Sequence, residues 1–329
     1  MSVRNDTAPM THVRFIIPAR NEAKHLAGCL EAIRDQRPSG CDWAVVVVDN
    51  ASTDQTAEIA RRYGAEVIDV PPGNPGRSRN AGAATAPEAD FFAFVDADCL
   101  LPPGWLARCL QHMADPSVVG CGAIQAGAPP EAPWVERTWV AAIAPPPSDR
   151  WQCVDWLPAF NLMVRAAAFR SLGGFDGTLL TCEDSDLSFR LRTHGQLRRD
   201  HQVAVRHLGE SQTLSEFFRR EMWRSGGNFR SVWRRGSLSG ELPSLVIPFA
   251  YTAFCAAALV TLPVALWRSS LWAWAVTLGA AALLIVAPLL IAAVRYRGRR
   301  WLPTGSLLAV YLLARGIGPF VTTRRVERR

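Results

Sequence analysis

The sequence lacks several signatures that would assign a function directly. Its eight cysteines form neither a CxxC pair nor a Cys/His cluster with zinc-site spacing, so we expect reduced, mostly buried thiols. The glycine-rich stretch GNPGRSRNAG (73–82) is neither GxxxxGKS/T nor GxGxxG, which argues against a P-loop and against a Rossmann dinucleotide site. No DNA- or RNA-binding motif is present, and we expect no nucleic-acid partner.

A secretory signal is also missing from the first residues, MSVRNDTAPMTHVRF, which contain no apolar core segment. We therefore expect the front of the chain to remain in the cytoplasm. The net charge of +7 is concentrated in arginines at 190–235 and 295–329, which flank apolar segments. This distribution favours an anionic membrane surface over a nucleic-acid groove.

Three short apolar runs, each ending in polar residues, are present in the first hundred positions. Because they are rich in β-branched and aromatic residues, they predict strands of a parallel sheet that is covered on both faces. Helical patterns alternate with them, which indicates an α/β fold with a Rossmann-like, doubly wound sheet. Ligands of such sheets bind at the carboxyl ends of the strands. The predicted strands lie within 13–22, 44–54 and 91–98, and the predicted helices are 22–34, 53–63 and 77–86.

The chain changes character after Leu242, where long apolar stretches begin. Residues 244–267 and 271–294 carry no formal charge, and each exceeds the roughly 20 residues that cross a bilayer. A buried soluble hairpin is the alternative. Arginines on either side of this pair place both outer ends in the cytoplasm, which predicts a multi-pass protein of the cell inner membrane. Residues 304–321 contain Arg315, so we expect an interfacial or re-entrant helix there, with a third spanning helix as the alternative.

A proline-flanked insert at 127–150 interrupts the alternating pattern. Its central segment WVERTWVAAIA (134–144) predicts either a loop lid or a short amphipathic helix at the membrane interface. A surface excursion without a ligand role is the alternative. We place the boundary between a cytoplasmic domain (1–240) and a membrane region (241–329) near the change in composition after Leu242.

Two carboxylates, Asp96 and Asp98, follow the apolar run FFAFV. On an extended chain, residues i and i+2 point to the same side, so both could face one hard cation. Mg²⁺ or Mn²⁺ bound by one or two carboxylates usually completes its shell with water and phosphate oxygens, which predicts a diphosphate ligand. A simple turn or helix cap is the alternative.

Five successive motifs resemble those of family 2 glycosyltransferases with the GT-A fold. They are IIPARNE, VVVVDNASTDQT, GRSRNAG, FVDAD and FNLMVRAAAFRSLGGFDGTLLTCEDSDLSFRLRTHG. The similarity runs from about Val13 to Gly195. It implies a nucleotide-diphosphate-sugar donor, a divalent metal (Mg²⁺ or Mn²⁺), and inversion at the anomeric carbon.

The resemblance also implies roles for individual residues of the donor and metal sites. Asp96 and Asp98 match the family's DxD motif, in which the second residue is usually the closer metal ligand. His207 is a candidate for a third metal ligand or a diphosphate contact, against the alternative of an ordinary packed histidine. The candidate donor contacts, Asp96 included, are Pro18, Arg20, Glu22, Asp49, Asp54, Arg79 and Asp96.

The segment CEDSDLSFRL (182–191) resembles the family's ED motif. This implies that Asp184 is the base that takes a proton from the acceptor hydroxyl, with Glu183 as support or alternative. The other interpretation is that these acids merely stabilise a helix N-terminus.

Processive synthases of this family carry a QxxRW signature, which the corresponding RREMW (219–223) does not match. We therefore predict transfer of a single sugar to a lipid-linked or glycan acceptor at the membrane. A processive polysaccharide synthase and a catalytically inactive, glycosyltransferase-like membrane scaffold are the alternatives. A sugar nucleotidyltransferase is less consistent, because it explains neither the ED motif nor the apolar end of the chain.

Overall fold

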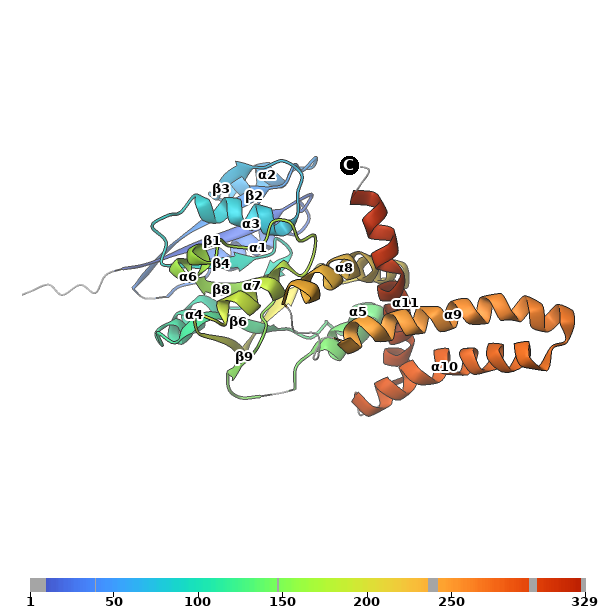
Figure 1. Cartoon of the computed structure of the whole chain (residues 1–329). Helices are drawn as coiled ribbons and strands as arrows, with labels where there is room; N and C mark the ends of the chain where they lie inside the picture. Colours follow the sequence, from blue (N-terminus) through green and yellow to red (C-terminus); the bar gives the residue numbers. More distant parts are fainter. Residues whose placement is uncertain (1–9, 39, 147, 236–241, 296–300, 327–329) are drawn as a thin grey trace, which may run out of the picture. The chain divides into compact units, whose positions relative to one another are not determined.

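A computed structural model describes residues 10–38, 40–146, 148–235, 242–295 and 301–326 (Figure 1). The chain forms two compact units: one combines Met1–Ala126 with Pro145–Gly209, and the other combines Gly127–Ala144 with Glu210–Arg329. The boundary expected near residue 240 therefore falls inside the second unit. That unit also includes the central part of the insert and the amphipathic segment that precedes the apolar helices.

The first unit alternates strands and helices, as the sequence predicts. Its strands are β1 (Thr11–Ala19), β2 (Cys41–Asp49), β3 (Glu66–Asp69), β4 (Phe91–Val95), β5 (Cys99–Leu100), β6 (Val118–Gln125), β7 (Gln152–Cys153), β8 (Asn161–Arg165) and β9 (Gln196–His207). Its helices are α1 (Leu26–Arg34), α2 (Thr56–Arg62), α3 (Pro75–Ala84), α4 (Trp105–Met113), α6 (Ala166–Ser171) and α7 (Glu183–Leu191).

These strands form one mixed sheet with the order β3-β2-β1-β4-β8-β6-β9-β5, and β7 pairs with β9. Strands β3, β2, β1 and β4 are mutually parallel, whereas β8 is antiparallel to both of its neighbours. The Rossmann-like, doubly wound arrangement expected from the sequence is confirmed for the parallel half. The antiparallel strand β8 returns the chain to the carboxyl end of β4, since Asn161 pairs with Val95.

The sheet is buried on both faces because its strands are apolar at nearly every position. Along β1, Phe15 belongs to one core cluster together with residues of α1 and α4, such as Leu26 and Trp105. The next residue, Ile16, belongs to the opposite cluster together with residues of α3, α6 and α7, such as Leu187. Side chains alternate between faces with a period of two, so a continuous apolar run supplies both cores.

Helix α3 begins two residues earlier than the sequence pattern predicts. Asn74 is its N-cap, and the Asn74 side-chain oxygen accepts a hydrogen bond from the backbone N–H of Arg77 at 2.9 Å. Pro75 occupies the first helical position, where its missing N–H costs nothing. This cap fixes where the helix starts and therefore where Arg79 lies along it.

The second unit contains α5 (Trp134–Ile143), α8 (Leu214–Arg235), α9 (Leu242–Arg268), α10 (Leu271–Arg295) and α11 (Trp301–Val326). The central segment of the insert is thus a helix rather than a loop lid. Helices α9 and α10 form an antiparallel hairpin (Figure 1). A small core is formed where Val135 of α5, Phe217 of α8 and Leu307 of α11 meet.

Helices α9, α10 and α11 each contain a segment that is long and apolar enough to span a membrane. The windows of α9 and α10 are 11% and 22% buried, whereas that of α11 is 39% buried. Helix α11 is continuous through Arg315, and it is one of the three candidate spans, as the alternative reading of this segment expected. Its interfacial placement stays a prediction. The arginine-rich stretches that suggested the orientation include 296–300 and 327–329, which lie outside the described residues.

Arg315 is tolerated in an apolar helix because it has a buried acidic partner. Its Nε atom lies 3.1 Å from Oε2 of Glu221 on α8, and Glu221 is completely buried. The other oxygen of Glu221 contacts Nη1 of Arg224 at 2.8 Å. Small residues let the helices approach, since a side chain at Gly316 would collide with the backbone carbonyl of Pro248 on α9.

Removing only one charge of this pair should destabilise the second unit more than removing both. We expect Glu221→Leu to cost about 3–5 kcal/mol, because it leaves the Arg315 guanidinium without its carboxylate in an apolar setting. The double variant Glu221→Leu/Arg315→Met should recover most of that loss. Thermal unfolding of the detergent-purified protein measures both. Equal or greater destabilisation of the double variant would contradict this account.

Candidate active site

The predicted strand ends meet at one edge of the sheet. In the parallel register Ala19 pairs with Asp49, and Ile16 pairs with Phe94. The residues that follow β1, β2 and β4 therefore emerge side by side. They include Arg20 and Glu22 after β1, and Asp96 and Asp98 after β4. Pro18 is half-buried within β1, one residue before its end.

The loops after β1 and β2 are joined by hydrogen bonds between side chains and backbone. Asn21 has a positive φ of 56°, and its side-chain oxygen accepts from the backbone N–H of Thr53 at 2.8 Å. The backbone N–H of Glu22 donates to the hydroxyl of Thr56 at 2.8 Å. These contacts fix both loops, and the Arg20 side chain remains exposed beside them.

Asp49 and Asp54, two predicted donor contacts, have local backbone partners. Asp49 is buried and accepts from the N–H of Ser52 at 3.2 Å. Asp54 accepts from the backbone of Ala23 and of Thr56, at 3.1 and 3.0 Å. Desolvation opposes ionisation of Asp54, but the hydrogen bonds from Thr56 and Ala23 outweigh it and lower the pKa of that carboxyl group. Asp54 thus joins the two loops in this structure.

Asp96 and Asp98 lie in a turn rather than on an extended strand. Strand β4 ends at Val95, and the N–H of Cys99 donates to the carbonyl of Asp96 at 3.0 Å. The expectation that both carboxylates face one side of an extended chain is therefore wrong. A turn gives the two carboxylates different neighbours, and each has its own partner.

Asp96 is held by Arg79 of α3. Nη2 of Arg79 lies 2.7 Å from Oδ1 of Asp96, and Nη1 of the same guanidinium lies 2.8 Å from Oε1 of Glu183. The DxD and ED motifs, far apart in the sequence, are thus joined through one arginine. The Arg79 side chain is only 4% exposed, and its guanidinium lies 5.4 Å from the centre of the Phe175 ring.

Asp98 faces His207 at the end of β9. Oδ1 of Asp98 lies 3.5 Å from Nε2 of His207, and Asp98, Cys99 and His207 form a group of the right size to hold a metal ion. Burial, together with the charges of Asp98 and Asp96, raises the pKa of the Cys99 thiol well above its usual value, so the thiol stays protonated. The useful ligand atoms are therefore the Asp98 carboxylate and the His207 imidazole.

Carboxylates predominate in this region. Burial raises the pKa of Glu22. The nearby charges of Asp98 and Asp96 raise it further, and His25 opposes the shift. Glu183 and Asp184 add two further carboxylates. Oxygen and imidazole ligands with excess negative charge fit a hard divalent cation such as Mg²⁺ or Mn²⁺.

Asp184 lies in the first turn of α7. Burial and the neighbouring charge of Glu183 raise its pKa to about 6, and Arg79 and hydrogen bonds from the backbone of Ser185 and Ala159 oppose the shift. A carboxylate with a pKa of about 6 is ionised at neutral pH and is a stronger base than an exposed aspartate. The helix-end interpretation also has some support, since the acids do occupy the helix N-terminus.

Sequence reasoning missed two residues that shape the site. Asn80 exchanges two hydrogen bonds with the backbone of Phe175, at 2.8 and 2.9 Å, and so fixes the loop beside Arg79. It follows Arg79 in the GRSRNAG motif, which could have identified it. Gly209 lies against Asp98, and any side chain there would collide with the Asp98 carboxylate. No local signal marks this long-range contact.

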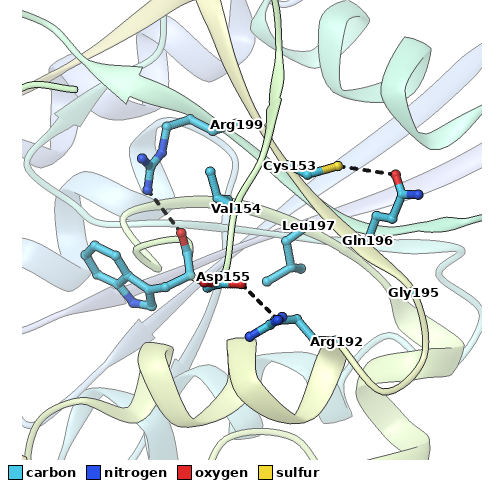
Figure 2. Close-up of a pocket in the computed structure, with 9 residues that line it drawn as sticks. Cys153, Val154, Asp155, Arg192, Gly195, Gln196, Leu197 and Arg199 are labelled. Carbon is cyan, nitrogen blue, oxygen red and sulfur yellow. Dashed lines mark hydrogen bonds and ion pairs between the residues drawn. The ribbon is translucent and has the colours of Figure 1, made fainter. Parts of the chain in front are cut away.

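A cavity of about 520 Å³ lies elsewhere in the first unit (Figure 2). It contains the exposed ion pair between Asp155 and Arg192, at 2.9 Å, and the hydrogen bond from Arg199 to the carbonyl of Trp156, at 3.0 Å. Arg192 follows the last turn of α7, whereas Asp184 lies in the first turn. The cavity lining includes none of the predicted site residues, so we do not assign the active site to it.

The mixed sheet of this chain matches the GT-A class of glycosyltransferase fold. Within this class, residues 15–172 match the family described as Glycosyl transferase family 2. This match confirms the resemblance to family 2 glycosyltransferases that the sequence motifs indicated.

Similar proteins include a glycosyltransferase and a polysaccharide biosynthesis protein. The pre-mycofactocin glycosyltransferase of Mycobacterium tuberculosis is 28% identical over 224 residues, which are 65% of this chain and 46% of the relative. This chain thus spans less than half the length of that relative. The succinoglycan biosynthesis protein ExoA of Rhizobium meliloti is 24% identical over 284 residues, which cover 81% of this chain and 85% of ExoA.

Two solved structures share the fold. The mannosyltransferase PcManGT from Pyrobaculum calidifontis, in complex with GDP-Man and Mn²⁺, has a TM-score of 0.65 at 20% identity and covers 94% of this chain and 87% of its own. Staphylococcus aureus TarS 1-349, in complex with UDP-GlcNAc, has a TM-score of 0.51 at 15% identity, with coverage of 96% and 92%. At these identities, the likeness establishes the fold.

Proposed function

We propose that the protein is an inverting, metal-dependent glycosyltransferase that transfers one sugar from a nucleotide-diphosphate sugar to a lipid-linked or glycan acceptor. The observation that carries this proposal is the joining of Asp96, which lies beside Asp98, to the ED motif through Arg79. Sugar transfer from a diphosphate requires a cation-binding region, which stabilises the departing diphosphate, and a nearby base, which is Asp184 with its raised pKa.

The chemistry is a single displacement. The Asp184 carboxylate takes the proton of the acceptor hydroxyl, whose oxygen forms a bond to the anomeric carbon from the face opposite the diphosphate. The bond between that carbon and the diphosphate oxygen breaks, and its electron pair leaves with the nucleotide diphosphate. Asp98 and His207 would hold the divalent ion, which neutralises charge on the departing diphosphate when it is bound.

The residues at the other strand ends are proposed to bind the donor. Pro18, Arg20, Glu22 and Asp49 lie where a base and ribose would approach the carboxyl ends of β1 and β2. We propose that the Asp96 carboxylate contacts the cation on the side that faces the donor. Arg79 holds the other face of that carboxylate. Asp54 was predicted as a donor contact. We now propose that it supports the donor site indirectly, because its hydrogen bonds fix the two loops.

The apolar helices support a location at the membrane, with the enzyme domain in the cytoplasm and the chain crossing the inner membrane more than once. Anchoring confines enzyme and lipid-borne acceptor to one plane, which favours such an acceptor. The processive alternative loses support from the absent QxxRW signature. The scaffold alternative is disfavoured by the acidic groups gathered at the strand ends, which a non-catalytic module would not need.

A donor screen tests the proposed function. Detergent-purified protein is incubated with a panel of UDP-, GDP- and dTDP-sugars, with Mn²⁺, with Mg²⁺ and with EDTA, and release of nucleotide diphosphate is measured. We expect one donor class to be turned over only with metal. Release from no donor, and no donor binding in the presence of metal, would favour the scaffold alternative. Product length by mass spectrometry separates single transfer from polymerisation.

A further inference from the structure

Arg79 is the buried cation of the active site. Its two terminal nitrogens are both engaged by carboxylates, at 2.7 Å to Asp96 and 2.8 Å to Glu183. Its Nε has no hydrogen-bond partner among the described residues. Burial alone would disfavour a charged guanidinium, but the charges of Asp96 and Glu183 overcome this and raise the pKa of Arg79. The guanidinium is therefore permanently charged, and both of its terminal nitrogens are held by carboxylates of the protein.

The geometry of this contact suits arginine specifically. A planar guanidinium can present separate N–H groups to two carboxylates at once, while lysine offers a single point charge on a flexible stem. One carboxylate follows β4, and the other begins α7. Asn80 and the Phe175 ring fix the surroundings of the Arg79 guanidinium. Helix α3 and the loop after α6 therefore set the direction in which this group points.

Arg79 also acts on Asp184 through its charge. Among the described residues, the charges that shift the pKa of Asp184 are those of Glu183 on its own helix and Arg79 on α3, and they act in opposite directions. Glu183 and burial favour the protonated acid, whereas Arg79 favours the carboxylate. Without Arg79, the balance would move toward protonation of the proposed base at neutral pH.

We propose that Arg79 is a positioning residue that couples the DxD and ED motifs: its guanidinium sets the spacing of Asp96 and Glu183, and with it the place of Asp184, the residue that follows Glu183. This role rests on the proposed function and replaces a direct donor contact by Arg79 with contacts inside the protein. It assigns the second arginine of the GRSRNAG motif to the charge around the proposed base as well as to the shape of the site.

Two substitutions separate the charge of Arg79 from its geometry. In Arg79→Met the charge and the fork are both lost, so the acid limb of the kcat/KM pH profile should move up by about one pH unit or more. In Arg79→Lys the charge stays near, so the limb should remain close to the wild-type position while kcat falls about tenfold or more. Glu183→Gln should move the limb in the opposite direction, to lower pH.

Arg165→Met is the matched control. Arg165 is a half-buried arginine at the far end of β8, where it donates to the carbonyls of Val118 and Met113 and lies over the Phe91 ring. Its loss should lower thermal stability and leave the acid limb in place. A purely structural role for Arg79 predicts the same result for Arg79→Met, so an unmoved limb in that variant overturns the proposal.

The proposal can still be tested if Arg79→Met fails to fold, because Arg79→Lys should lower kcat with the limb near its wild-type position, whereas Glu183→Gln should move the limb to lower pH. If both leave the limb and kcat unchanged, the proposal is wrong. Asp184→Asn distinguishes this failure from that of the proposed function. An inactive Asp184→Asn with an unmoved Arg79→Met limb refutes only the role of Arg79, whereas an active Asp184→Asn refutes the assignment of the base itself.

Discussion

Replacing Asp184 with asparagine should lower kcat by about 10²–10⁴-fold, because positioned general bases contribute roughly that much. Asparagine has nearly the same shape, so the donor and metal sites should remain intact and the KM for the donor should change little. The measurement is steady-state transfer to acceptor under saturating donor and metal, with circular dichroism to verify folding. Turnover within about threefold of wild type would contradict the assignment of Asp184 as the base.

The wild-type enzyme should show a matching pH dependence. Since the pKa of Asp184 is raised to about 6, kcat/KM should fall below pH 6 as the carboxylate becomes protonated, with a slope of one. The acid limb should be absent from any residual activity of Asp184→Asn. Asp186→Asn is the matched control, since Asp186 is on the same helix and pairs with Arg190 at 2.6 Å. It should lose some stability and keep its turnover.

The sequence was most informative where chemistry and periodicity coincide. Each predicted strand among the first hundred residues is present, because β-branched and aromatic runs such as AVVVV have few alternatives in a covered parallel sheet. Strand ends in a parallel sheet share one edge, so the gathering of Arg20, Asp49 and Asp96 followed from pattern alone. This part of the fold needed no long-range information.

Contacts between distant segments could not be read in this way. The pattern predicted a helix from Glu22, yet α1 begins at Leu26, because the backbone N–H groups of Glu22 and Ala23 donate to side chains at the start of α2 and in the loop before it. The bridge from Arg79 to Glu183 and the approach of Gly209 to Asp98 depend on tertiary packing between separate motifs. Neither leaves a periodic or local trace in the sequence.

Arg315 illustrates the same limit in the apolar region. A charged residue within an apolar stretch argues against a spanning helix when its partner is unknown. The buried Glu221 that accepts it lies on a different, amphipathic helix, and nothing in the local sequence of either segment announces the pairing. The sequence could therefore predict a helix in this segment. It could not predict the energetic cost of the Arg315 charge, because that cost depends on Glu221.

Asp98→Ala should abolish most metal-dependent transfer, with a loss in kcat/KM of about 10²–10³-fold or more. The carboxylate of Asp98 faces His207, and its removal leaves the His207 imidazole without the carboxylate with which it would share the cation. Charge on the departing diphosphate would then lose its main electrostatic support, whose removal in enzymes typically costs this much. Activity titrated with Mn²⁺ and calorimetric binding of Mn²⁺ with nucleotide diphosphate measure the two effects separately.

A carboxylate at the opposite end of the same strand provides the control for Asp98. Asp90 precedes β4 and accepts a hydrogen bond from the backbone N–H of His12 at 2.9 Å, so Asp90→Ala removes an acid of the same charge from the amino end of the strand. This variant should retain its Mn²⁺ dependence, whereas Asp98→Ala should require far more Mn²⁺ or show no response. His207→Gln should weaken Mn²⁺ binding less than Asp98→Ala, because a neutral ligand contributes less to a hard cation than a carboxylate. Wild-type Mn²⁺ affinity in Asp98→Ala would remove Asp98 from the metal site and leave the acidic cluster without its proposed purpose.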